Sequence, residues 1–130
     1  MKFYVASRVK HAEMWKALRA KNYPIISTWI DEAGDGETGD FAELWERITK
    51  EISKSDGLIL YVENEDFPLK GAFVEVGIAI AFNRPIFVVL PGVKLEGRTM
   101  RPVGSWLKHD LVTVCDHLDH AFILAQSSEV

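Results

Sequence analysis

Short apolar runs alternate along this chain with longer segments whose apolar residues recur every three or four positions. Five runs have the length and composition of β-strands, at residues 3–6, 25–28, 58–62, 86–90 and 111–114. The segments between and after them predict helices, at residues 9–21, from about 40 to 54, at 72–82 and at 118–126. The helical spacing is clearest in the second of these, where Leu44, Ile48 and Ile52 fall on one face.

The alternation of strands and helices extends over residues 1–130 without a linker or a repeat, which predicts a single domain. Strand–helix–strand units with right-handed crossovers build a parallel sheet that is covered on both faces. We therefore predict a flavodoxin-like α/β fold, a three-layer αβα sandwich with a five-stranded parallel sheet in the order 2-1-3-4-5. Ligands bind such sheets at the carboxyl ends of the strands, where the loops at 7–8, 63–70 and 91–102 would meet.

Glu75 is the one charged residue in the apolar run at 72–82. A helix that is apolar on all sides is normally buried, and a buried carboxylate must be paired, protonated or used in chemistry. A simpler interpretation is that the positive end of the helix dipole stabilises a glutamate in the first turn. Glu75 is the first candidate for a functional residue.

The composition limits the classes of function. The formal net charge is −4 and Lys and Arg form no basic stripe, which argues against binding to a nucleic-acid polymer. No apolar run reaches the roughly 20 residues that span a bilayer, and no signal-peptide pattern opens the chain. We therefore expect no membrane association and a cytoplasmic location. The single cysteine, Cys115, excludes an intramolecular disulfide.

No motif predicts a metal or an organic cofactor. The acidic loop at residues 31–40 lacks two ligands of a calcium-binding EF-hand, because its third and twelfth positions are Ala33 and Ala42. His117 and His120 share one predicted helical face, but no third ligand is indicated. The glycine-rich signatures of dinucleotide and triphosphate sites are also missing. We expect neither a metal nor a cofactor.

Residues near the predicted loops suggest a site for a small anion or a base. Ser7 and Arg8 offer a hydroxyl, a guanidinium and backbone N–H groups to an anion, although a capping serine beside a solvated arginine is the alternative. Gly71 would let the backbone approach a ligand closely, or is an ordinary loop residue. Trp29 and Trp106 would stack on a base or pack in the core.

Four segments together resemble the nucleoside 2-deoxyribosyltransferase family and its relatives, the 2′-deoxynucleoside 5′-phosphate N-hydrolases. They are residues 3–8, residues 52–60, residues 71–81 with the following Arg84 and Pro85, and Ser105 and Trp106 with Asp110. The third is the most specific, since a glycine precedes a glutamate by four residues ahead of an Arg-Pro strand. The resemblance implies cleavage or transfer of the N-glycosidic bond of a deoxynucleoside or its 5′-monophosphate.

The resemblance also implies roles for individual residues. Glu75 would attack the anomeric carbon and form a covalent glycosyl-enzyme, while Tyr4 would hydrogen-bond this nucleophile. Ser7 and Arg8 would hold a 5′-phosphate. The other candidates for contact with the substrate are Trp29, Asp31, Asp56 and Gly71, and the acidic loop at 31–40 would close over the base.

The family completes its active sites across subunits. By this resemblance, Ser105 and Trp106 would reach into the site of a neighbouring copy of the chain. We therefore expect a homodimer or a larger homo-oligomer whose ligand is a small nucleoside or nucleotide.

Two departures from the family pattern concern acids that act around the base. The transferases have an aspartate about six residues before the nucleophile, where residues 68–70 of this chain contain no acid, and another at the position of Ile48. Glu51, Asp31 and Glu65 are the candidates to replace them. Two other functions stay open: a TIR-like NAD glycohydrolase, and a nucleotide-binding or sensing module without catalytic activity.

Overall fold

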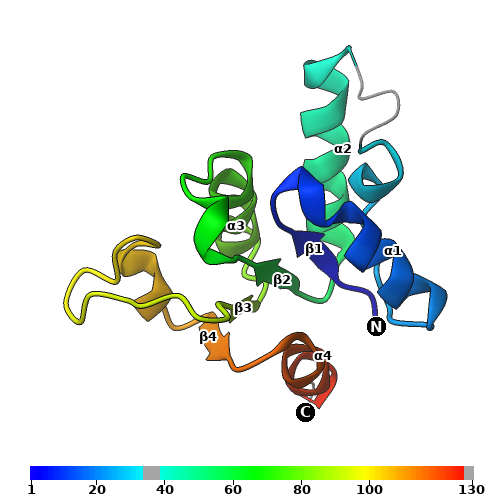
Figure 1. Cartoon of the computed structure of the whole chain (residues 1–130). Coiled ribbons are helices and arrows are strands. Elements are labelled where there is room, and N and C mark those ends of the chain that lie inside the picture. The colour runs from blue at the N-terminus through cyan, green and yellow to red at the C-terminus, as the bar shows by residue number, and fades with distance from the viewer. Residues whose placement is uncertain (34–38, 128–130) are drawn as a thin grey trace.

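The computed structural model describes residues 1–33 and 39–127, which form a parallel sheet with helices on both faces (Figure 1). Within these residues the sheet has four strands, in the spatial order β1-β2-β3-β4. The strands are β1 (Tyr4–Ala6), β2 (Leu58–Tyr61), β3 (Ile86–Val89) and β4 (Val112–Cys115). All three pairings are parallel. The predicted α/β class and the parallel sheet are confirmed.

The α-helices lie in two layers, one on each side of the sheet. Those in the described part of the chain are α1 (Ala12–Ala20), α2 (Phe41–Lys54), α3 (Gly71–Ala81) and α4 (Leu118–Ser127). One layer contains α2 and α3, and the other contains α1 and α4 (Figure 1). Asp40 caps α2, since its Oδ1 accepts a hydrogen bond of 3.0 Å from the Glu43 N–H. None of these helices is long and apolar enough to cross a bilayer.

Alternate residues of each strand enter two separate hydrophobic cores. Tyr4 points to the layer of α2 and α3, where it packs in the same core as Ile52. Val5 points to the other layer, in the core that contains Trp15 of α1 and Phe122 of α4. Because side chains alternate along a strand, the short β1 serves both cores. The alternation also places Tyr4 on the side of the sheet that α3 covers.

The second predicted strand does not form. The segment makes only an isolated parallel bridge, from Phe3 to Ile25. Side chains occupy the backbone groups that a longer pairing would use: Ser27 Oγ accepts from the Val5 N–H at 2.7 Å, and Trp29 Nε1–H donates to the Val5 carbonyl at 2.8 Å. The five-strand count and the order 2-1-3-4-5 are not confirmed, because these side-chain hydrogen bonds replace the backbone ladder.

Candidate active site

Tyr4 and Glu75 form a buried pair between β1 and α3. Glu75 lies one turn into α3, and only 7% of its surface is exposed. The Tyr4 hydroxyl, itself fully buried, donates to Glu75 Oε1 at 2.5 Å. No residue in the described part of the chain donates to Oε2. One carboxylate oxygen is therefore fixed, and the other is available to a ligand.

Burial changes the protonation of both residues. Removal from water raises the pKa of Glu75 from 4.5 to about 7, and the negative charge of Glu51 adds to this rise. The hydrogen bond from Tyr4 opposes the rise in pKa, because it stabilises the carboxylate. Burial, and then the charge of Glu75, raise the pKa of Tyr4 well above its ordinary value. The phenol therefore stays protonated and continues to donate.

Glu75 lines a cavity of about 550 Å³, a volume suited to a small molecule. One wall is apolar and contains Leu44, Trp45 and Ile48 of α2 together with Trp29 of the short 3-10 helix η2 (Trp29–Asp31). Trp29 is held by its hydrogen bond to the Val5 carbonyl. Aromatic rings in such a wall can stack on a nucleobase.

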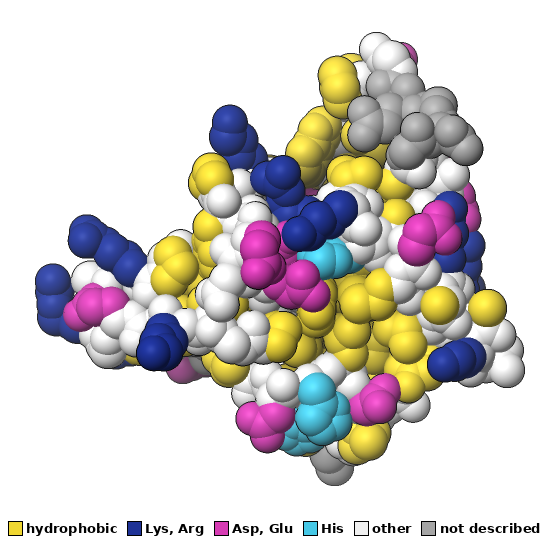
Figure 2. Space-filling model, viewed as in Figure 1, with side chains coloured by type: hydrophobic (Ala, Val, Ile, Leu, Met, Phe, Trp, Pro, Cys, Tyr) yellow, Lys and Arg dark blue, Asp and Glu magenta, His cyan; other side chains and the backbone are white. Residues whose placement is uncertain are grey.

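Part of the cavity rim is basic. Arg8 and Lys10 line it from the loop after β1, and Lys70 lines it from the position just before α3. Gly71 lines it as well, so the positive end of the α3 dipole lies at the cavity. Figure 2 shows basic side chains gathered with acidic side chains and a histidine on the face between α3 and the loop leading into α1. The basic rim suits an anionic group such as a phosphate.

The structure thus brings six of the predicted site residues together: Tyr4, Ser7, Arg8, Trp29, Gly71 and Glu75. Ser7 differs from its expected role as a donor to a phosphate. Its hydroxyl donates to the Arg8 carbonyl at 2.9 Å and accepts from Trp15 Nε1 at 2.8 Å. In this conformation the hydroxyl stabilises the loop, and its hydrogen is not available to a ligand.

Two predicted acids lie away from the cavity. Asp31 forms an ion pair with Arg19, with 2.6 Å between Asp31 Oδ1 and Arg19 Nη2. Asp56 precedes β2, at the end of the strand opposite to the cavity, and accepts from the Lys2 N–H at 2.8 Å. Residues 34–38, the middle of the acidic loop expected to close over the base, lie outside the described residues.

Ser105 and Trp106 also lie away from the cavity of their own chain. They belong to a short 3-10 helix, η4 (Ser105–Lys108), in the connection from β3 to β4. The Trp106 ring packs edge-to-face on Phe73 of α3, with 5.6 Å between the ring centroids. Their expected role in the site of a neighbouring subunit stays a prediction.

The acids considered as replacements near the base differ in position. Glu51 lies close enough to Glu75 to raise its pKa, but both its oxygens accept hydrogen bonds from Thr28. Asp31 is bound to Arg19, and Glu65 is exposed in the turn η3 (Asn64–Asp66). None of these three acids lines the cavity. Among the described residues that line it, Glu75 is the only acid.

Lys10, Trp45 and Lys70 are among the cavity residues that sequence reasoning missed. A signal existed for Trp45, which adjoins Leu44 and precedes Ile48 by three positions in the amphipathic α2. Lys70 belongs to the loop at 63–70, which the parallel sheet is expected to bring to this edge, whereas Lys10 falls in the segment predicted as a helix at 9–21 and gave no signal beyond its charge.

Comparison with known proteins supports the fold. No protein-family model and no curated protein sequence matches this chain. Among similar solved structures is a 2-deoxyribosyltransferase from Bacillus psychrosaccharolyticus, with a TM-score of 0.64 at 16% identity, over 90% of this chain and 87% of that one. Another is the CMP N-glycosidase BcmB from Clostridium botulinum, with a TM-score of 0.53 at 14% identity, over 97% of this chain and 99% of that one. At these identities the similarity shows a shared fold.

Proposed function

We propose that this protein cleaves or transfers the N-glycosidic bond of a deoxynucleoside or its 5′-monophosphate, with Glu75 as the nucleophile. The observation that carries the proposal is the buried Tyr4–Glu75 pair in a cavity with an aromatic wall and a basic rim. Two proteins of similar fold are named as a 2-deoxyribosyltransferase and a CMP N-glycosidase, which supports N-glycosidic bond chemistry in general.

The reaction follows the double displacement of retaining glycosidases. Glu75 Oε2 attacks C1′ of the sugar, the C1′–N bond breaks, and the base leaves with the bonding electron pair and takes up a proton. Since Glu75 is the only acid among the described lining residues, we propose that water supplies this proton. Water, or a second base in a transfer reaction, then attacks C1′ and regenerates the Glu75 carboxylate. Tyr4 keeps the carboxylate oriented throughout.

The basic rim favours the 5′-monophosphate over the nucleoside. Arg8, Lys10 and Lys70 would surround the phosphate, next to the positive end of the α3 dipole. The base would lie against Trp29 and Trp45, where recognition by stacking is tolerant of the identity of the base.

A chromatographic assay for base release tests the proposal. The purified protein is incubated with the four 2′-deoxynucleoside 5′-monophosphates, their nucleosides and NAD, beside a Glu75→Gln variant. We expect free base from at least one monophosphate, and a rate at least about a thousandfold lower for the variant, which lacks the nucleophile.

The other outcomes separate the competing functions. Release of nicotinamide without any free base would favour an NAD glycohydrolase. Thermal stabilisation by a nucleotide without any product would favour a binding module, because a ligand that binds only the folded state raises its stability. Base release at equal rates by both proteins would contradict the assignment of Glu75.

A further inference from the structure

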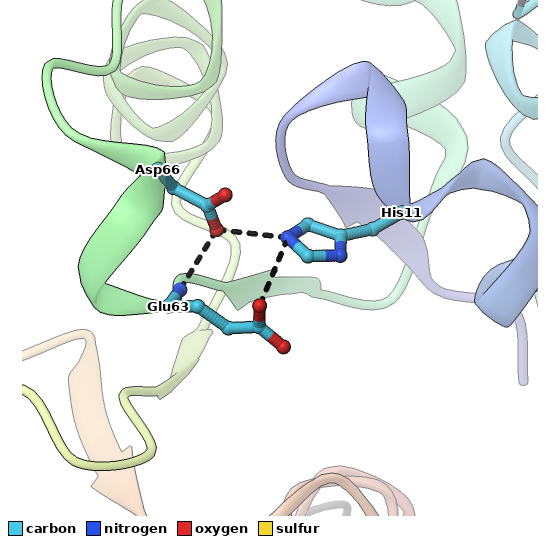
Figure 3. A group of neighbouring side chains, drawn as sticks. All are labelled: His11, Glu63 and Asp66. Carbon is cyan, nitrogen blue, oxygen red and sulfur yellow. Dashed lines mark hydrogen bonds and ion pairs between the residues drawn. The ribbon is translucent and has the colours of Figure 1, made fainter.

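One carboxylate ties the loop after β1 to the loop after β2. Asp66 Oδ1 lies 3.3 Å from Lys10 Nζ. Asp66 Oδ2 lies 2.8 Å from His11 Nε2. A dashed line marks this contact in Figure 3. Arg8 adds a further link, since its Nη1 donates to the Pro68 carbonyl at 3.2 Å. Both loops contribute to the cavity, so these contacts fix the relative position of two parts of its rim.

Asp66 has the properties of a fixed negative charge. Its side chain is 0% exposed, and its Oδ2 also accepts a hydrogen bond of 2.8 Å from the Glu63 N–H. Burial acts to raise the pKa of Asp66, but the Glu63 N–H, His11 and Lys10 together outweigh burial and lower it. A buried ionised carboxylate needs cationic partners, and Lys10 is the partner that also lines the cavity.

The group in Figure 3 also has the ligand types of a divalent-cation site, since atoms of His11, Glu63 and Asp66 lie within 4.8 Å of one another. Two of its carboxylate oxygens already accept hydrogen bonds, and Asp66 Oδ1, which accepts none among the described residues, faces the Lys10 ammonium in an ion pair. Asp66 Oδ2 is shared by the Glu63 N–H and His11, and Glu63 Oε2 accepts from the Tyr61 hydroxyl at 2.5 Å. The Lys10 ammonium adds positive charge at Asp66 Oδ1. These contacts favour an ion-pair cluster over a metal centre.

We infer that Asp66 is a positioning residue for the substrate phosphate, which it serves by holding the Lys10 ammonium at the cavity rim. The inference rests on the proposed function of the same cavity. The Lys10 side chain is 51% exposed, so its ammonium keeps N–H donors for a ligand while Asp66 restrains it. A lysine released from Asp66 would lose more side-chain entropy when it bound a phosphate. We expect this loss of preorganisation to outweigh the gain in phosphate affinity from removing the nearby negative charge of Asp66.

Calorimetric binding measurements test the inference. Dissociation constants are measured for the four 2′-deoxynucleoside 5′-monophosphates and their nucleosides, in the Glu75→Gln background so that no substrate is consumed. The variants are Asp66→Asn, which keeps an oxygen to accept the Glu63 N–H, Lys10→Met, and the combination of both. Glu65→Gln is the matched control, because Glu65 is an exposed acid in the same turn.

We expect Asp66→Asn and Lys10→Met each to weaken monophosphate binding about tenfold, which corresponds to about 1.4 kcal/mol. Nucleoside binding should stay within about twofold, and the double variant should bind no more weakly than either single variant, because the two residues act as one unit. Equal losses for monophosphates and nucleosides, an equal loss in Glu65→Gln, or the absence of a loss would overturn the inference. The inference would also be overturned if the Glu75→Gln parent bound no monophosphate.

These outcomes are independent of catalysis. A monophosphate preference that depends on Asp66, in a wild-type protein that releases no base, would uphold the inference and contradict the proposed reaction. Base release from nucleosides, without any dependence of binding on the phosphate, would uphold the proposed reaction and contradict the role of Asp66.

Discussion

At the scale of single residues, the contact between Tyr4 and Glu75 controls when the candidate nucleophile is charged. Burial raises the pKa of Glu75 to about 7, so this carboxyl group changes its protonation close to neutral pH. Tyr4 is the group that limits this rise, because its hydroxyl donates to Oε1. The rate of base release should therefore increase as the pH rises through about 7.

The substitution Tyr4→Phe should move this pH profile upward. Without the hydroxyl, burial acts on Glu75 unopposed, its pKa rises, and the rate at pH 7 falls about tenfold while much of the loss is recovered at higher pH. The measurement is the rate of base release from pH 5 to pH 9. Tyr61→Phe is the control, since Tyr61 donates to Glu63, outside the cavity lining. A profile for Tyr4→Phe that keeps the wild-type midpoint would contradict this role.

Glu75 should also make stability depend on pH. Its pKa is 4.5 in the unfolded chain and about 7 in the folded one, so its contribution to stability is complete below pH 4.5 and is lost as the pH rises through 7. At about 1.36 kcal/mol per pKa unit, the loss is about 3 kcal/mol. The Glu75→Gln variant has no charge to bury, and should exceed the wild type in unfolding free energy by up to that amount at pH 8, but not at pH 4.5.

Urea denaturation at the two pH values measures this difference. Glu46→Gln, an exposed position on α2, serves as the control and should change little at either pH. A Glu75→Gln variant with the same advantage at pH 4.5 and pH 8 would show that the buried charge is not the cause.

At the scale of elements, the apolar runs predict β1 to β4 and α3 within one or two residues. The strand predicted at 25–28 fails, because Ser27 and Trp29 satisfy the Val5 backbone with their side chains, which no hydrophobic pattern reveals. The residues of the candidate site likewise include some that the sequence predicts and some that it does not. Glu75 is predictable as a charge within an apolar run, and the meeting of the loops after β1 and β2 follows from the parallel sheet. That the side chains of Lys10 and Lys70 line the same cavity does not follow from the sequence pattern.

The wall formed by α2 should determine affinity for the base. Trp45→Ala removes an aromatic ring from the cavity, and substrate affinity should fall about tenfold, in keeping with the energy of stacking on a base. Phe41→Ala is the control, since Phe41 lies on the same helix but is 64% exposed and away from the cavity. Dissociation constants for the preferred monophosphate test both variants, and equal affinities in Trp45→Ala and Phe41→Ala would argue against stacking on this wall.

At the scale of the whole molecule, we propose that the protein is a homodimer or larger oligomer. The proposal comes from the resemblance of the segment with Ser105 and Trp106 to one that reaches a neighbouring site. This segment lies in the connection that extends away from the sheet beyond β3 (Figure 1). Sedimentation equilibrium should give a mass at least twice the 14.7 kDa of the chain. A single species of 14.7 kDa would remove the proposal, and would leave Trp106 with its contact to Phe73 as its role.

The central claim, that Glu75 bonds to the sugar, is tested most directly by trapping the intermediate. The protein is mixed with the monophosphate from which it releases base, quenched in acid within the first turnover, digested and mapped by mass spectrometry. We predict that the peptide containing Glu75 gains the mass of one deoxyribosyl 5-phosphate group, and that the same peptide from Glu75→Gln does not. Base release without an adduct on this peptide, or an adduct on another residue, would contradict the account.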